Sequence, residues 1–251
     1  MSKKRNKFLI INQGNGNDSF LVRNEFHKAL AKERLIEEIL LENELIEIKE
    51  EREKTPSLKQ VKIVELNYAN KKFQVEKIWR VNLEKQIPGI STIGKTTEVA
   101  LLVLQKYLES NSYRLNIILV ELKSSLQPKK TKSGKILSSS LEEIKEKFRD
   151  TMNRMYMLLT LNNYGNPDKD YSHASIYLHF RGAIFFHRNE IKEADIETND
   201  EKTLYVSLTG KKSILSCSTI MNNLDKIQVK SFSCINKDEG NIIVNMEDLL
   251  F

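Results

Sequence analysis

Residues 98–123 decide the fold, and they read EVALLVLQKYL, then ESNS, then YRLNIILVELK. Two apolar runs of similar length flank a polar turn, which is a pattern typical of a β-hairpin. The Ala and Leu content of residues 97–109 also favours a helix there, and periodicity does not decide between the two. Residues 115–120 are apolar and rich in β-branched side chains, so they predict a buried central strand.

Two helices are expected on either side of this stretch. Apolar side chains recur at roughly helical spacing over residues 22–53, without an interrupting Gly or Pro. A second apolar stripe over residues 140–162 begins with a Ser-x-x-Glu capping box, formed by Ser140 and Glu143.

Further strands are expected before the hairpin stretch and after the second helix. Residues 61–83 predict two strands paired around a turn at 70–72, and residues 175–187 predict a strand with a bend or bulge at Gly182. The last sixty residues show a helical piece at 219–224 and short β-like runs at 204–208, 214–217, 227–232 and 242–244.

These elements predict an α/β fold with a mixed central β-sheet flanked by the two helices. Residues 1–190 would form the core with its N-terminal helix, and residues 191–251 a β-rich C-terminal extension of the same domain. No long linker or internal repeat separates the two parts.

Charge is unevenly distributed along the chain. The net charge is +6, yet residues 33–53 hold nine Glu against three basic residues, a local balance of −6, so the remainder carries +12. Such a surplus suits a protein that neutralises nucleic-acid phosphates, although plain solubility also explains it. With 40% hydrophobic and 29% charged residues, the chain has the composition of a globular protein rather than a disordered one.

The sequence predicts a cytoplasmic protein without membrane contact. No run approaches the roughly 18 apolar residues of a spanning helix, and the apolar patch at residues 8–11 is too short for a secretory signal. Cys217 and Cys234 lack C-x-x-C spacing, so we expect small buried thiols rather than a redox or zinc site.

Glu121 and Lys123 end the predicted central strand. Because side chains alternate along a strand, both residues lie on the same face. A carboxylate at this position suits a hard cation such as Mg²⁺, and an ammonium group can orient a water molecule or stabilise charge on a phosphate.

At this point the chain resembles the PD-(D/E)XK nuclease superfamily, over roughly residues 20–190. The core of that family is a helix, three strands, a helix and a further strand. An acidic residue lies before or on the second strand, and (D/E)-x-K lies on the third. The resemblance implies that Glu121 and Lys123 are the second acid and the lysine, with Glu98 as the first acid. Where the family usually has Pro-Asp, this chain has Thr97-Glu98. Glu76 and Glu109 are alternatives for the first acid, and Glu25 is a candidate for a helical acid that completes the site.

The resemblance implies a Mg²⁺-dependent endonuclease acting on DNA, with Mn²⁺ as a substitute metal. Glu98 and Glu121 would hold the metal, and Lys123 would position the attacking water. A homodimer is expected, because two chains related by a twofold axis can cut both strands. Basic and polar residues after the motif are expected to meet DNA phosphates, namely Lys129, Lys130, Lys132, Lys135, Arg149, Asn153 and Arg154.

Two other functions stay open at the level of the sequence. Residues 89–96 match G-x-x-x-x-G-K-[ST], so an ATP-binding P-loop protein using Lys95 is the alternative enzyme. Pro88 precedes the motif, where a P-loop would have a buried strand. A nucleic-acid-binding module of the same fold that lacks catalysis is the third hypothesis.

Overall fold

The computed structural model describes residues 35–50, 57–83, 94–110, 112–129, 139–163, 175–234 and 240–251. Within these residues the larger sheet has seven strands, in the spatial order β1 (Ile36–Ile39), β4 (Phe73–Asn82), β5 (Val99–Tyr107), β6 (Ser112–Leu126), β7 (Ser175–Asn189), β9 (Asp225–Ser233) and β8 (Ser213–Cys217). The smaller sheet has the order β10 (Asn241–Asn245), β3 (Gln60–Val64) and β2 (Leu45–Lys49). The helical elements are α2 (Ser140–Asn163), the 3-10 turn η1 (Glu193–Asp195), α3 (Asn199–Ser207) and α4 (Met246–Leu249).

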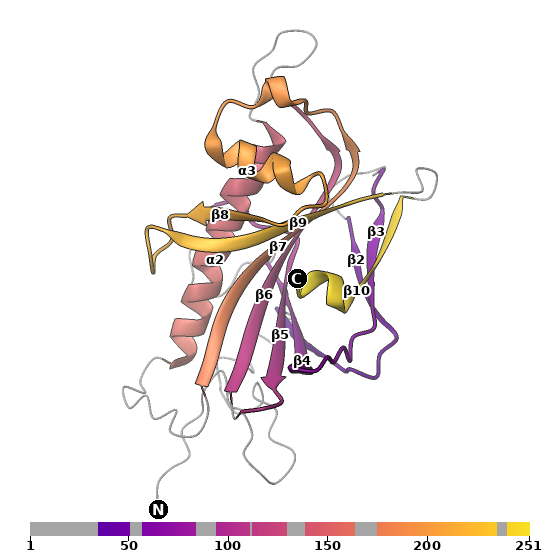
Figure 1. Ribbon diagram of the computed structural model, residues 1–251, viewed down its shortest axis with the longest axis vertical. Helices are drawn as coiled ribbons and strands as arrows, with labels where there is room; N and C mark the ends of the chain where they lie inside the picture. Colours follow the sequence, from indigo (N-terminus) through magenta and orange to yellow (C-terminus); the bar gives the residue numbers. More distant parts are fainter. Residues whose placement is uncertain are drawn as a thin grey trace, which may run out of the picture.

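The larger sheet lies between α2 on one face and the smaller sheet with α4 on the other (Figure 1). Ile117 of β6 belongs to the apolar cluster that contains Ile144 and Phe148 of α2. Ile118 and Val120 belong to the second cluster, which contains the apolar residues of the smaller sheet. Strand β6 is therefore buried on both faces, as the sequence predicted for a central strand. No helix in the described part of the chain is long and apolar enough to span a membrane.

Strands β5 and β6 form the antiparallel hairpin that was one of the two predictions for residues 98–123. Their register runs from Val99 opposite Val120 to Lys106 opposite Tyr113. Strand β7 then pairs with β6 in parallel, and α2 makes the crossover between them. The hairpin prediction is therefore confirmed. Most side chains of both strands are buried against one of the two layers.

Helix α2 confirms the predicted second helix, but its cap is shifted by one residue. Ser139 Oγ accepts a hydrogen bond from the N–H of Glu142 at 3.1 Å, and Glu142 Oε2 accepts one from the N–H of Ser139 at 3.3 Å. Ser140 Oγ instead accepts from the N–H of Gln127 at 2.8 Å and holds the end of β6. Residues 138–140 are three consecutive serines, so the sequence alone does not identify the cap. The packing of α2 decides that Ser139 is the capping residue.

The predicted helix over residues 22–53 is wrong for the part that the structure describes. Residues 36–39 and 45–49 are strands β1 and β2. In Leu45–Lys49 the buried residues Ile46 and Ile48 alternate with glutamate and lysine, which is the two-residue period of a strand. Within residues 35–50, two short strands therefore account for the apolar spacing that had suggested a helix. Residues 22–34 and 51–53 lie outside the described residues.

Both strands predicted over residues 61–83 are present as β3 and β4, but they do not form a hairpin with each other. Strand β4 pairs with β1 and β5, whereas β3 pairs with β2 and β10 in the smaller sheet. The Asn70 side chain still organises the turn, because its Oδ1 accepts from the N–H groups of Lys72 and Phe73, each at 2.8 Å.

Strand β7 confirms the prediction for residues 175–187, but it has no bend or bulge at Gly182. Gly182 pairs with Leu119 on one side and Val229 on the other in uninterrupted register. A Cβ atom at residue 182 would lie 2.7 Å from Phe148 Cζ. The glycine therefore allows α2 to approach the sheet closely.

The last sixty residues contribute strands to both sheets. The predictions of strands near 214–217, 227–232 and 242–244 are confirmed by β8, β9 and β10. Residues 204–207 belong to helix α3, so the strand predicted at 204–208 is wrong, and residues 219–224 form turns rather than a helix. Thr198 and Glu201 form a capping box at the start of α3. The apolar run at 204–208 had favoured a strand over this local helix signal. Both cysteines are buried thiols, as the sequence predicted.

Candidate active site

The structure brings Glu98, Glu121 and Lys123 together on the face of the larger sheet that α2 covers. Glu98 immediately precedes β5, and its N–H donates to the carbonyl of Val120 at 3.1 Å, which continues the β5–β6 register. Lys123 Nζ lies 3.6 Å from Glu121 Oε1. The alternation predicted from the sequence therefore holds for Glu121 and Lys123.

Helix α2 adds two charged residues that the sequence analysis did not identify. Lys147 Nζ forms ion pairs with Glu121 Oε1 and, at 3.4 Å, with Glu98 Oε1. Glu143 Oε2 accepts a hydrogen bond from Lys123 Nζ at 3.3 Å. Glu143 and Lys147 are four residues apart and share one helix face. In the sequence, a Glu and a Lys four residues apart on the helix that follows the Glu-x-Lys strand were the signal that could have indicated their role.

Backbone contacts hold the first carboxylate in position. Glu98 Oε2 accepts a hydrogen bond from the N–H of Leu122 at 2.9 Å. The N–H of the preceding residue, Thr97, donates to Thr151 Oγ1 of α2 at 3.1 Å. The start of β5 is thus tied to both β6 and α2, so the carboxylate is placed by rigid elements.

The site is buried at its base and open at Lys123. The side chain of Glu121 is 0% exposed and that of Lys147 is 7% exposed, whereas that of Lys123 is 20% exposed. Burial raises the pKa of Glu121 well above its usual range, and the charge of Glu98 raises this pKa further, while Lys147 and Lys123 oppose the rise. For Lys123, burial lowers the pKa, but Glu121 and Glu143 more than offset burial and the net pKa is raised.

These residues suit Mg²⁺ more than a cation that needs a full protein cage. Within the described residues, no group of three or more His, Cys, Asp or Glu side chains is arranged to hold a metal. Mg²⁺ commonly binds through one or two carboxylates and keeps water and phosphate ligands. Glu121 Oε2 is buried and accepts no hydrogen bond from the described part of the chain. Glu98 and Glu121 can therefore supply the protein ligands of one Mg²⁺ ion.

The other acids considered for the first position lie elsewhere. Glu76 is an exposed residue of β4, and Glu109 lies in the turn at the far end of the β5–β6 hairpin. Glu25 lies outside the described residues. Among the acids that the structure describes, Glu98 is therefore the one placed beside Glu121.

The predicted phosphate-binding residues differ in their environments. Lys129 pairs with Glu197 at 2.9 Å and Glu142 at 3.8 Å, and Arg149 pairs with Asp150 at 2.8 Å while its side chain is 42% exposed. Asn153 Oδ1 accepts from the N–H of Ile220 at 2.8 Å. Lys130, Lys132 and Lys135 lie outside the described residues.

Arg154, which the sequence analysis expected to meet DNA phosphates, is buried rather than exposed on the second helix. The residue is 7% exposed, and its guanidinium donates to the backbone carbonyl of Leu83. Burial lowers the pKa of Arg154. Arg154 follows Asn153 on α2, and this step around the helix directs the Arg154 side chain toward the sheet. Arg154 therefore connects α2 to the end of β4 rather than to a ligand.

The end of the P-loop match does not have P-loop geometry. A P-loop lysine and threonine begin a helix, whereas Lys95 and Thr96 lead into strand β5. Asp150 Oδ2 accepts from the N–H of Lys95 at 3.2 Å, and Lys95 Nζ pairs with Glu146 at 3.3 Å. These carboxylates lie where a P-loop would present donors to phosphate. Residues 89–93 lie outside the described residues.

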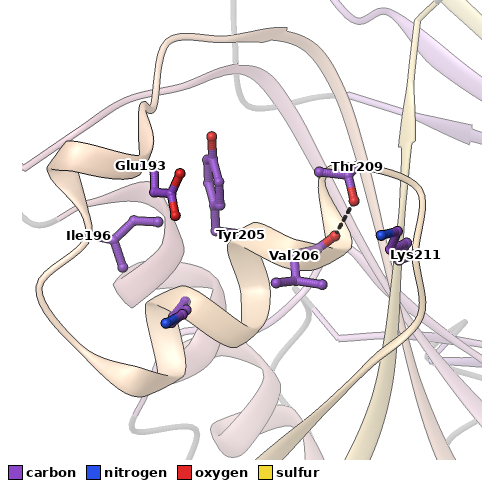
Figure 2. A pocket seen from close by; sticks show the side chains of 7 residues that line it. Glu193, Ile196, Tyr205, Val206, Thr209 and Lys211 are labelled. Carbon is purple, nitrogen blue, oxygen red and sulfur yellow. Dashed lines mark hydrogen bonds between the residues drawn. The ribbon is translucent and has the colours of Figure 1, made fainter.

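A separate hollow of about 390 Å³ lies beside α3. Figure 2 shows Tyr205 and Val206 of α3 in its wall, with Glu193 and Ile196 of the preceding segment and Lys211 across from them. None of the residues around Glu121 lines this hollow.

Comparison of the chain with protein-family models, with curated proteins and with solved structures finds no match.

Proposed function

We propose that the protein is a Mg²⁺-dependent endonuclease that hydrolyses phosphodiester bonds of DNA. The observation that carries the proposal is the meeting of Glu98 and Glu121 at the base of a site whose entrance holds Lys123. Two carboxylates can hold a metal ion, and an ammonium group can orient water or stabilise charge on a phosphate, which suits metal-assisted phosphodiester hydrolysis. The surplus of positive charge outside residues 33–53 supports a polyanionic substrate.

The order of elements supports placing the chain in the PD-(D/E)XK superfamily. Strands β4, β5 and β6 are consecutive and antiparallel, and α2 and the parallel strand β7 follow. Glu98 directly precedes the second of these strands, and Glu121-Leu122-Lys123 lies on the third. A family helix before the first strand has no counterpart among residues 35–50, which form β1 and β2 instead.

Each side chain has a defined task in the proposed reaction. Glu98 and Glu121 would hold the metal ion, which, when bound, neutralises charge on the scissile phosphate and activates a water molecule. Lys123 keeps its proton at neutral pH because its pKa is raised. It therefore acts as a hydrogen-bond donor that orients the water or stabilises a phosphate oxygen, and not as a general base. Glu143 holds the Lys123 ammonium at the entrance.

Plasmid cleavage tests the proposal. Supercoiled DNA is incubated with MgCl₂ and either wild type, Lys123→Ala or Lys95→Ala. We expect Lys123→Ala to lose about 10²-fold or more of the cleavage rate, as expected when a donor to the transition state is removed, and Lys95→Ala to retain it. Loss of activity in Lys95→Ala alone would favour the P-loop function. DNA binding by a wild type that never cleaves would favour the non-catalytic module.

The partner proposed beyond DNA is a second copy of this chain. The apolar runs at 204–208 and 242–244 offer little support for pairing between two copies, because residues 204–207 are helical and β10 is paired with β3. Ile243 of β10 nevertheless stays 67% exposed. Light scattering at micromolar concentration, with and without DNA, tests the dimer. A mass of 29.2 kDa in both conditions would contradict it.

A further inference from the structure

We propose that Lys147 is an internal counter-cation of the site, which neutralises Glu98 and Glu121 in the metal-free protein and which a divalent cation must displace. This inference rests on the proposed function only in taking Glu98 and Glu121 as metal ligands. It adds a mechanism by which the chain itself sets its affinity for the metal.

The contacts of Lys147 place its ammonium between the two carboxylates. Nζ forms an ion pair with Glu121 Oε1 and lies 3.4 Å from Glu98 Oε1. The side chains of Lys147 and Glu98 are each 7% exposed, and that of Glu121 is 0% exposed. A metal held by both Glu98 and Glu121 would have to lie between the two carboxylates, where the Lys147 ammonium lies. The ammonium and the metal therefore compete for one position.

Electrostatics explains why a cation is needed there. Two buried carboxylates repel each other, and each is poorly solvated, so one of them gains a proton or both share a positive partner. Lys147 lies between the two carboxylates and supplies such a positive partner. A divalent ion neutralises the pair more fully than one ammonium does. An ion between the two carboxylates would repel the Lys147 ammonium most strongly because that ammonium lies between the same two groups, whereas Lys123 Nζ lies 3.6 Å from Glu121 Oε1.

The helix offers the displaced ammonium another partner. Glu143 lies one turn before Lys147 on the same face of α2, and its carboxylate is at the entrance beside Lys123. The four-carbon stem of lysine permits movement from Glu121 toward Glu143. Metal binding would then place a second ammonium near Lys123 and Glu143. The exchange thus couples metal loading to a more positive entrance.

Calorimetric titration of the full chain with MgCl₂ and with MnCl₂ tests the proposal. Lys147→Met keeps the length and loses the charge, so we expect it to bind either metal at least about tenfold more tightly than wild type. The matched control is Lys145→Met on the same helix, whose ammonium pairs with Asp200 of α3 and not with the site. This control should bind metal as wild type does.

Thermal unfolding supplies a second measurement that does not depend on cleavage. In EDTA we expect Lys147→Met to melt below wild type, because its two carboxylates lack their closest cation, and saturating Mg²⁺ should restore most of the loss. The double variant Glu121→Gln/Lys147→Met removes both charges and should melt near wild type in EDTA with little response to Mg²⁺. Folding of Lys147→Met only when Mg²⁺ is present would also support the proposal.

Several results would overturn it. Equal or weaker metal binding by Lys147→Met would show that Lys147 assists the metal site or merely supports the fold. The absence of metal binding in both wild type and Lys147→Met, or failure of Lys147→Met to fold with Mg²⁺ when the double variant folds, would have the same consequence. If Lys147→Met binds metal more tightly while wild type cleaves no DNA, the nuclease proposal fails and the exchange stands.

Discussion

Glu98 accepts a hydrogen bond from the backbone N–H of Leu122, with 2.9 Å between Oε2 and the nitrogen. Leu122 separates Glu121 from Lys123 in the chain, so this bond connects the first carboxylate directly to the Glu-x-Lys motif. It also leaves Glu98 Oε1 directed to Lys147. One oxygen of Glu98 therefore holds the backbone of β6, and the other pairs with Lys147.

Substitution of Glu98 should separate these two tasks. Glu98→Gln keeps a side-chain oxygen for the Leu122 N–H but loses the negative charge. We expect cleavage in Mg²⁺ to fall about 10²-fold or more, comparable to the loss of one transition-state stabilising group, with unfolding free energy changed by only about 1 kcal/mol. Plasmid cleavage and denaturant unfolding measure the two effects. Glu76→Gln, on the exposed side of β4, is the control and should leave both unchanged. An active Glu98→Gln variant would remove Glu98 from the site.

The raised pKa of Glu121 predicts how metal affinity depends on pH. A metal binds the ionised carboxylate, and the raised pKa means that protons compete with the metal at higher pH than at an ordinary glutamate. The affinity of wild type for Mg²⁺ should therefore increase as pH rises through this pKa and then level off. Titration calorimetry at a series of pH values measures this. A pH-independent affinity, or the same dependence in Glu121→Gln, would contradict the assignment.

The same pKa predicts the pH dependence of stability without metal. The folded state binds the Glu121 proton more tightly than the unfolded state does. Its stabilising contribution is therefore fully present below the unfolded-state pKa and is lost as pH rises through the folded-state pKa. In EDTA, wild type should lose unfolding free energy relative to Glu121→Gln over this rise in pH. Urea unfolding of both proteins across the range is the measurement, and a difference that grows in the opposite direction would refute it.

Arg154 and Arg149 should respond differently to removal of their charge. Arg154→Met leaves the buried Leu83 carbonyl without its charged donor, which should cost about 1.5–3 kcal/mol of unfolding free energy. Arg149→Met removes an exposed side chain paired with Asp150 and should change stability by no more than about 0.5 kcal/mol. If Arg149 contacts a phosphate, the salt dependence of DNA binding should weaken by about one charge. Unfolding and salt-titrated binding together distinguish these roles.

Gly182 should be intolerant of a side chain because of Phe148. Gly182→Ala places a Cβ atom 2.7 Å from the Phe148 ring, and we expect a loss of about 1–3 kcal/mol. Combined with Phe148→Leu, the cost should be less than the sum of the single variants, since the smaller side chain leaves room. Gly210, whose surroundings are open within 4 Å, is the control, and Gly210→Ala should be additive with Phe148→Leu. Additivity at Gly182 would contradict the contact.

Local patterns in the sequence were sufficient for the central strand and for part of the site. The apolar run at 115–120 and the polar turn before it predicted β6 and allowed the hairpin with β5. Alternation along one strand placed Glu121 and Lys123 on one face, because that relationship spans only two residues. The apolar stripe of 140–162 likewise predicted α2, because helical periodicity acts over neighbouring turns.

Tertiary packing decided the rest. Lys147 meets Glu121 across 26 residues only because α2 crosses back over β6 at a particular depth and rotation. Strand β3 pairs with β10 from the far end of the chain rather than with the neighbouring β4, and α2 turns Arg154 inward to Leu83. Residues 36–39 and 45–49 are strands because their isoleucines pack in two different sheets. Contacts of this kind depend on which surfaces are buried together, and a one-dimensional hydrophobic period does not record that choice.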